Sequence, residues 1–130
     1  MAKTARAAIK SQKTAIDLLT EAVIRGLQDR KAKDIKLMDL RGISSAVSDF
    51  FIVCHGESST QVEGLARNVE QEVEKETGEI PAHIEGTKNA QWVLIDYISV
   101  VVHIFQPEQR SYYGIERLWA DAEIRDIESN

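Results

Sequence analysis

The residues best placed to do chemistry in this sequence follow a short apolar run, at Cys54-His55-Gly56-Glu57-Ser58-Ser59. A loop that leads from a strand into a helix can bind an anion through the free backbone N–H groups of the helix start. The segment lacks the Gly-Lys-Ser/Thr ending of a Walker A loop and the three spaced glycines of a dinucleotide fingerprint. We therefore interpret it as a capped helix start, with a nucleotide site as the alternative.

The cysteine and histidine of this segment are neighbours, as a thiol nucleophile and its base would be in space. Neighbouring side chains on a strand point to opposite faces, so Cys54 and His55 do not meet there. We predict that Cys54 is a small buried side chain. His55, His83 and His103 do not have the spacing of zinc ligands. No metal site, cofactor or covalent catalysis is expected.

The aspartates of the chain stand apart from one another, and no Asp-x-Asp occurs. A nucleotidyltransferase needs paired aspartates to hold its two metal ions. The glutamates between residues 63 and 76 have the spacing of a solvated helix face rather than of an acid–base pair. The carboxylates therefore show neither of these catalytic arrangements, and a nucleotide-dependent enzyme stays the weaker interpretation.

Aromatic residues gather in the last third of the chain, although they make up only 6% of it. The gathered residues are Trp92, Tyr97, Phe105, Tyr112, Tyr113 and Trp119, with Arg110 and Arg117 between them. Trp, Tyr and Arg are the residue types enriched in the hot spots of protein–protein interfaces. We expect one part of this group to lie in the core and another part to form a docking surface.

The composition is that of one globular domain: 130 residues, 43% hydrophobic and 28% charged. The net charge of −5 disfavours general binding to DNA or RNA and favours a basic protein partner. The longest apolar runs are far shorter than the ~20 residues that span a membrane. One cysteine fits a reducing compartment, so we expect a cytoplasmic protein. The basic start, which holds no acid before Asp17, leaves an organellar transit peptide as an alternative.

The apolar periodicity predicts an α/β (α+β) fold, with a mixed β-sheet flanked by helices. The expected helices are 14–31, 60–78 and 107–119, and the expected strands are 35–40, 49–54, 92–96 and 100–105. The strand 100–105 is apolar at nearly every position, as in a strand covered on both faces. We expect Pro81 and Ile84-Glu85-Gly86 to lead through a polar loop, residues 87–91, into the strand 92–96, and a further strand or loop is left open. One domain, 15–119, would then lie between a basic lead-in, 1–14, and a frayed acidic tail, 120–130.

Six blocks of the sequence resemble, in order, those of the ribosomal silencing factor family, also called Iojap or RsfS. The first blocks are Asp49-Phe50-Phe51-Ile52-Val53 and Gly56-Glu57-Ser58-Ser59-Thr60-Gln61-Val62. The later blocks are Glu85-Gly86, Trp92 with Asp96, the run Val100 to Phe105, and finally Arg110, Tyr113, Glu116 and Leu118-Trp119. The resemblance extends over roughly residues 15–119.

The resemblance implies a translational repressor that is not an enzyme, with a nucleotidyltransferase-like topology that lacks the catalytic carboxylates. It implies binding to the large ribosomal subunit through ribosomal protein fourteen, which sterically blocks joining with the small subunit. A role in large-subunit assembly and a homodimer are the open alternatives. The residues carried over as partner-binding are Trp92, Asp96, His103, Phe105, Arg110, Tyr113, Glu116 and Trp119.

Three positions depart from the pattern of the family. Ile98-Ser99 replaces the usual Gly-Asp in the turn between the last two expected strands, and His55 replaces the usual Thr. Gly114 stands where the family has an apolar or acidic residue in the last helix. A glycine inside a helix costs about 1 kcal/mol relative to alanine. These departures put individual contacts in doubt.

Overall fold

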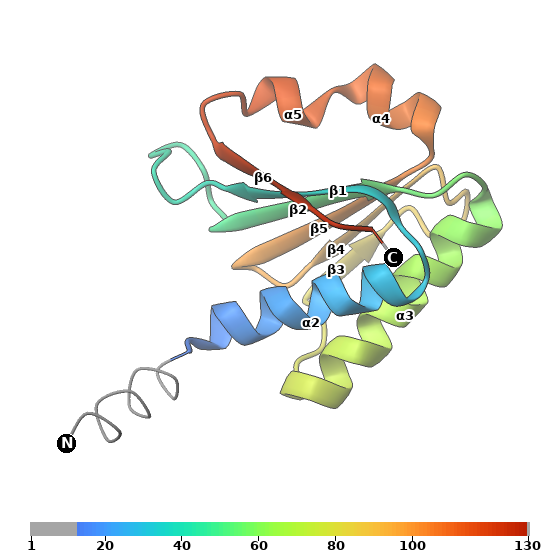
Figure 1. Cartoon of the computed structure of the whole chain (residues 1–130), viewed down its shortest axis with the longest axis horizontal. Coiled ribbons are helices and arrows are strands. Elements are labelled where there is room, and N and C mark those ends of the chain that lie inside the picture. Colours follow the sequence, from blue (N-terminus) through green and yellow to red (C-terminus); the bar gives the residue numbers. More distant parts are fainter. Residues whose placement is uncertain (1–12, 130) are drawn as a thin grey trace.

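A six-stranded sheet lies between two pairs of helices, with α2 and α3 on one face and α4 and α5 on the other (Figure 1). The computed structural model describes residues 13–129, so most of the expected lead-in lies outside the described residues. The elements in chain order are α2 (Ala15–Asp29), β1 (Lys33–Asp39), β2 (Phe50–His55), α3 (Ser59–Thr77), β3 (His83–Glu85), β4 (Trp92–Asp96), β5 (Val100–Phe105), α4 (Pro107–Tyr113), α5 (Ile115–Leu118) and β6 (Glu123–Ile127).

The strands are ordered β3-β4-β5-β2-β1-β6, and the sheet is mixed. Strands β2 and β5 run parallel in its centre, and the other neighbouring pairs are antiparallel. Every residue of β5 is buried, as its continuous apolar run predicts. The predicted mixed sheet flanked by helices is therefore confirmed.

The two faces of the sheet are covered unequally. The larger core cluster packs between the sheet and the long helices α2 and α3, and includes Ile52, Val102 and Ile104. A smaller cluster, with Val53 and Phe105 of the opposite face, packs against the residues of α5 and the segment after it. Because α4 has seven residues and α5 only four, they cover that face incompletely. This partly covered face carries the candidate site.

The long helices begin and end with side chains and glycines suited to those positions. Thr14 and Asp17 form a capping box at the start of α2. The Ser58 hydroxyl accepts a hydrogen bond from the Gln61 N–H at the start of α3, and Gly78 ends that helix in the left-handed conformation. The sequence predicts the stop at Gly78 correctly. It places the start of α3 about one residue late, because Ser58 provides the cap.

Two segments for which the sequence predicts no defined strand form the edge strands of the sheet. Residues His83–Glu85, which come before the predicted loop 87–91, pair with β4. The frayed tail after Ala120 is a wrong prediction, because Glu123–Ile127 pairs along β1. Its side chains are mostly exposed and charged, as in edge strands that avoid further pairing. The apolar pattern of Glu123–Ile127 is therefore weak, and this segment forms its hydrogen bonds with β1, which lies about 90 residues earlier in the chain.

The last helix is also different from the prediction, because it is divided at Gly114. This glycine adopts a left-handed conformation with φ of 56°, and its N–H donates to the Arg110 carbonyl as α4 ends. A Cβ atom there would overlap the Arg117 guanidinium, which packs against the glycine. Gly114 is thus a helix-ending residue, and the cost of a glycine inside a helix does not apply.

Gly86→Ala is expected to lower the free energy of unfolding by at least about 2 kcal/mol. Gly86 has a φ of 85°, and a Cβ atom would overlap the backbone oxygen of Trp92. Urea unfolding measures the effect. Gly42→Ala is the matched control, because a Cβ atom at Gly42 meets no other atom within 4 Å. Equal losses of stability in the two variants would contradict the prediction.

Candidate functional site

The structure brings the eight predicted residues to the partly covered side of the sheet. Side chains alternate between the faces of a strand, and the register places Trp92 beside Phe105 and His103 beside Leu94 on this face. Asp96 lies four residues further along β4, about 13 Å from Trp92. The other four, on and after the short helices, are Arg110, Tyr113, Glu116 and Trp119. They separate into an aromatic surface, an ion-pair network and a turn.

The aromatic surface consists of Phe51, Trp92, His103, Tyr113 and Trp119. The Trp92 ring lies 4.7 Å from the Tyr113 ring, and the Phe51 ring lies 4.6 Å from His103, between centroids. Trp119 meets Phe51 edge to face at 5.9 Å. Aromatic pairs in such tilted and edge-on arrangements attract each other beyond the effect of burial alone. Residues from three strands and both sides of Gly114 thus form one continuous surface.

His103 is the buried member of the aromatic surface and supports the Trp92 ring. It is only 4% exposed, and its Nδ1 accepts a hydrogen bond from Trp92 Nε1 at 3.2 Å. Burial lowers the pKa of His103 to about 4, so the ring is neutral at pH 7 with its proton on Nε2. Phe105 is fully buried and stacks on Trp92 at 4.9 Å. Both residues are therefore buried beneath the Trp92 ring and hold it in place.

His103 is expected to make the protein less stable in mild acid. Its pKa is about 4 in the folded protein and near 6.5 in the unfolded chain, so below pH 6.5 the unfolded chain binds the extra proton. Stability is therefore complete above pH 6.5 and is lost as the pH falls toward 4. We expect a loss of about 2 kcal/mol between pH 7 and pH 5 from this residue alone.

Urea unfolding of the wild type and of His103→Gln at pH 7 and pH 5 measures this loss. The glutamine variant can still accept a hydrogen bond but does not titrate, so its stability should change less between the two pH values. If the wild type and His103→Gln lost the same stability between pH 7 and pH 5, His103 would not be a source of acid sensitivity.

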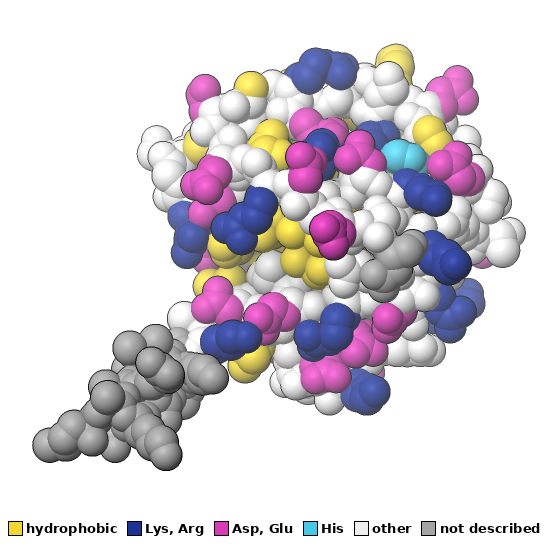
Figure 2. Space-filling view, in the orientation of Figure 1, with side chains coloured by type: hydrophobic (Ala, Val, Ile, Leu, Met, Phe, Trp, Pro, Cys, Tyr) yellow, Lys and Arg dark blue, Asp and Glu magenta, His cyan; other side chains and the backbone are white. Residues whose placement is uncertain are grey.

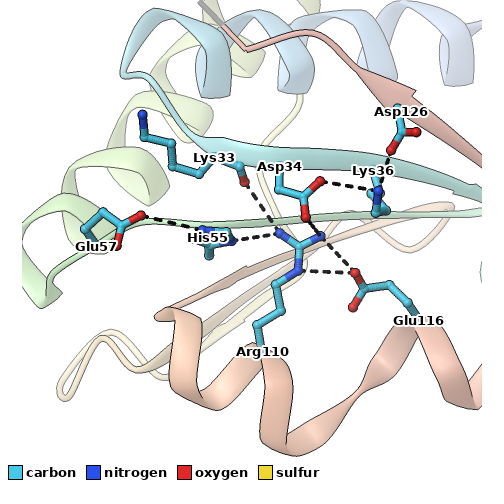
Figure 3. A network of polar contacts seen from close by, with 8 residues as sticks. All are labelled: Lys33, Asp34, Lys36, His55, Glu57, Arg110, Glu116 and Asp126. Atoms are coloured by element: carbon cyan, nitrogen blue, oxygen red, sulfur yellow. Dashed lines mark hydrogen bonds and ion pairs between the residues drawn. The ribbon is translucent and has the colours of Figure 1, made fainter.

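Arg110 occupies the centre of a polar network between α4, α5 and the first strands (Figure 3). It is only 7% exposed, and its guanidinium donates to Glu116 Oε1 from Nη2 at 2.9 Å and from Nε at 3.2 Å. Its Nη1 lies 3.0 Å from His55 Nδ1 and 3.5 Å from the Lys33 carbonyl oxygen. Asp34 is a longer ion-pair partner, at 3.7 Å. The network joins the short helices to β1 and β2.

The same network fixes the state of His55. Burial first, and then the nearby Arg110 charge, lower the pKa of His55 below its usual value. A neutral ring accepts the hydrogen bond that Arg110 offers to its Nδ1. Arg110 and Glu116 are thus engaged with each other and with the sheet. They link α4 and α5 to the sheet, and their prediction as partner-binding residues stays a prediction.

Asp96 stabilises the turn between β4 and β5. Its Oδ1 accepts a hydrogen bond from the Ile98 N–H at 2.7 Å. Ile98 adopts a left-handed conformation with φ of 74°, which is rare for a β-branched residue. The turn therefore keeps a shape that favours glycine, although this chain has isoleucine there. The Ile98 side chain is consequently exposed.

Sequence reasoning missed three exposed apolar side chains in the loops and the short helix at this side of the chain: Val47, Ile98 and Leu118. Hydrogen bonds from Asp49 and Phe50 to the Ser99 carbonyl join the loop of Val47 to the turn of Ile98. The contact between Phe51 and Trp119 brings the end of α5 to the same region. No periodicity in the sequence indicates them, because two lie in loops and the third ends a four-residue helix.

The segment with the most reactive residue types is a capped helix start, as predicted. Cys54 is buried, and burial raises the pKa of its thiol to about 12. The Glu57 N–H donates to the Gln61 side chain, and the Gln61 N–H donates to Ser58. Within residues 13–129, no cluster of His, Cys, Asp and Glu is arranged to hold a metal ion. In the same part of the chain, no helix is both long and apolar enough to cross a membrane.

Comparison with known proteins agrees with the resemblance seen in the sequence. Residues 12–130 match the family model described as "Ribosomal silencing factor during starvation". The ribosomal silencing factor RsfS of Bacillus subtilis is 43% identical over 100 residues, which cover 77% of this chain and 83% of that protein. A crystal structure from Chromobacterium violaceum has 38% identity and a TM-score of 0.73, and covers 78% of this chain and 83% of its own. A crystal structure from Bacillus halodurans has 36% identity and a TM-score of 0.69, and covers 85% of this chain and 96% of its own. This chain belongs to the ribosomal silencing factor family.

Proposed function

We propose that this protein is a cytoplasmic translational repressor that binds the large ribosomal subunit and blocks joining with the small subunit. We further propose that ribosomal protein fourteen is its docking partner, and that it acts by steric occlusion rather than by catalysis. The observation that carries the proposal is the aromatic surface on the partly covered sheet face, where the exposed Tyr113 packs on Trp92 and the exposed Leu118 adjoins Trp119 in the chain. Exposed apolar clusters of this kind are characteristic of protein-binding sites.

Charge supports a basic protein as the partner. The chain carries a net charge of −5, which favours association with a basic surface. Figure 2 shows acidic and basic side chains interspersed on the side it presents, without the continuous basic stripe that binds a nucleic-acid backbone. We therefore propose that this chain binds a ribosomal protein rather than DNA or bare ribosomal RNA.

The eight residues of the sequence prediction take two roles in this proposal. Trp92, Tyr113 and Trp119 provide contact area on the aromatic surface, extended by the exposed Leu118 next to Trp119 in the chain. The residues that position this surface are Asp96, His103, Phe105, Arg110 and Glu116. Direct contact by a few aromatic anchors is sufficient for specific binding, because a small share of interface residues provides most of the affinity.

Co-sedimentation of the full chain with isolated large and small ribosomal subunits tests the proposal. The protein should sediment with the large subunit alone, in an amount that saturates at one copy per subunit. Failure to sediment with the large subunit would overturn the proposal. Saturation at two copies would replace the single bound copy with a homodimer, which sedimentation velocity of the free protein detects independently.

A further inference from the structure

A small pocket of about 140 Å³ lies where the turn before β4 faces α4. Its lining residues are Gly86, Asn89, Gln91, Trp92, Gln109 and Tyr113. Three of these side chains are uncharged amides and two are aromatic, so the lining combines hydrogen-bonding groups with ring faces. The pocket borders the aromatic surface through Trp92 and Tyr113.

The walls of this pocket are fixed by hydrogen bonds. The Ala90 N–H donates to the Gly86 carbonyl at 3.0 Å and closes the turn. Gln106 then joins the turn to the start of α4: its side-chain amide donates to the Ala90 carbonyl at 3.0 Å, and its N–H donates to the Gln91 carbonyl at 2.8 Å. A pocket held in this way binds a ligand without first ordering its own residues.

One polar atom of the pocket lacks a partner. Gln109 Oε1 is buried, and within residues 13–129 no donor forms a hydrogen bond with it. The last side-chain torsion of glutamine is broad, so the amide can turn its oxygen toward the pocket that the residue lines. A buried amide oxygen without a donor is a costly arrangement, and once it is turned into the pocket, a ligand rich in N–H groups can donate to it.

We propose that this pocket binds the side chain of an arginine presented by the basic protein partner. A guanidinium is planar, carries five N–H donors and stacks on aromatic faces, so it suits amide oxygens and the Trp92 and Tyr113 rings together. A lysine ammonium is more strongly hydrated and cannot stack. The choice of a protein partner rests on the proposed function and on the net charge of −5.

The direct test is an NMR titration of the ¹⁵N-labelled full chain with three probes. These are N-acetyl-arginine methylamide, N-acetyl-lysine methylamide and adenosine monophosphate. The arginine probe should shift the Trp92 indole N–H and the Gln109 side-chain amide at millimolar concentration, and the lysine probe should bind at least about 5-fold more weakly. The Trp119 indole, which does not line the pocket, is the internal control.

Variants of Gln109 test the role of the unpartnered oxygen. Gln109→Leu should weaken binding of the arginine probe at least about 5-fold, and Gln109→Glu should strengthen it, because a carboxylate accepts charge-assisted hydrogen bonds. Gln71→Leu, an exposed glutamine on α3, is the control and should leave binding unchanged. Preferential binding of adenosine monophosphate, or equal binding of all probes, would overturn the proposal.

The outcome can be separated from that of the proposed function. Arginine binding by a wild-type chain that does not sediment with ribosomal subunits would leave the pocket assigned and remove the ribosomal partner. Sedimentation with the large subunit, without any shift by the arginine probe, would support the ribosomal partner and overturn the arginine pocket. If the wild-type chain both sediments with the large subunit and binds the arginine probe, Gln109→Leu should also lower its affinity for the large subunit, and Gln71→Leu should not.

Discussion

Arg110→Ala is expected to lower the free energy of unfolding by about 3–5 kcal/mol. The guanidinium is 7% exposed and is bound by Glu116, by His55 and by the Lys33 carbonyl. Removing it leaves the Glu116 carboxylate partly buried without its cation, and removes the link between α4 and the first strands. An uncompensated charge in such a place costs far more than a surface ion pair contributes.

Chemical denaturation measures this loss, and two variants make it specific. Arg67→Ala removes an exposed arginine on α3 and should change stability by less than about 0.5 kcal/mol. Arg110→Met combined with Glu116→Leu removes both charges and should recover much of the stability, because no carboxylate is left unpaired. A small effect of Arg110→Ala, equal to that of Arg67→Ala, would contradict the positioning role.

Tyr113→Ala is expected to weaken binding to the large ribosomal subunit by about 30-fold, while the protein remains folded. Tyr113 is 46% exposed and packs against the Trp92 ring at 4.7 Å, within the proposed contact area. Truncation of an interface aromatic at a hot spot costs about 2 kcal/mol or more, which corresponds to that factor. Quantitative co-sedimentation gives the affinity, and circular dichroism confirms the fold.

Leu18→Ala is the matched control for this variant. Leu18 is also 46% exposed but belongs to α2, which lies across the other face of the sheet. It should therefore bind the large subunit as the wild type does. If Leu18→Ala and Tyr113→Ala weakened binding equally, the aromatic surface would not be the contact area.

Leu118 allows a test of the sign of charge on the partner. Its side chain is exposed at the end of α5, so a charged residue is tolerated by the fold. With a basic partner, Leu118→Lys should weaken binding to the large subunit more than Leu118→Glu does. The opposite order would show that the partner surface is acidic.

Local patterns in the sequence predict most of the fold, but they do not predict the two edge strands of the sheet. The apolar stripe of α3 ends at Gly78, and the continuous apolar run of β5 marks a buried central strand. The edge strands His83–Glu85 and Glu123–Ile127 are short and mostly exposed, so they carry little periodicity. Their structure depends on pairing with distant strands. The division of the last helix depends on the left-handed Gly114, which sequence reasoning placed inside a helix.

For the candidate site, the sequence indicates which residues gather, but it does not indicate which of them are buried. The resemblance to the family selected residues that do gather on one side of the sheet. It could not separate contact from support, since Arg110 and His103 are residue types that usually face solvent or a partner. Their burial depends on Glu116 from α5 and on Trp92 from the next strand. Exposure of Leu118 likewise follows from the short α5 rather than from any pattern.

The most direct test of the central claim is a subunit-joining assay followed by light scattering. Purified large subunits are incubated with a saturating amount of this protein before small subunits are added. We predict that joining is lost, that Tyr113→Ala restores it at the same concentration, and that Leu18→Ala does not. Normal joining by large subunits that carry the bound protein would contradict the repressor account and favour a role in subunit assembly.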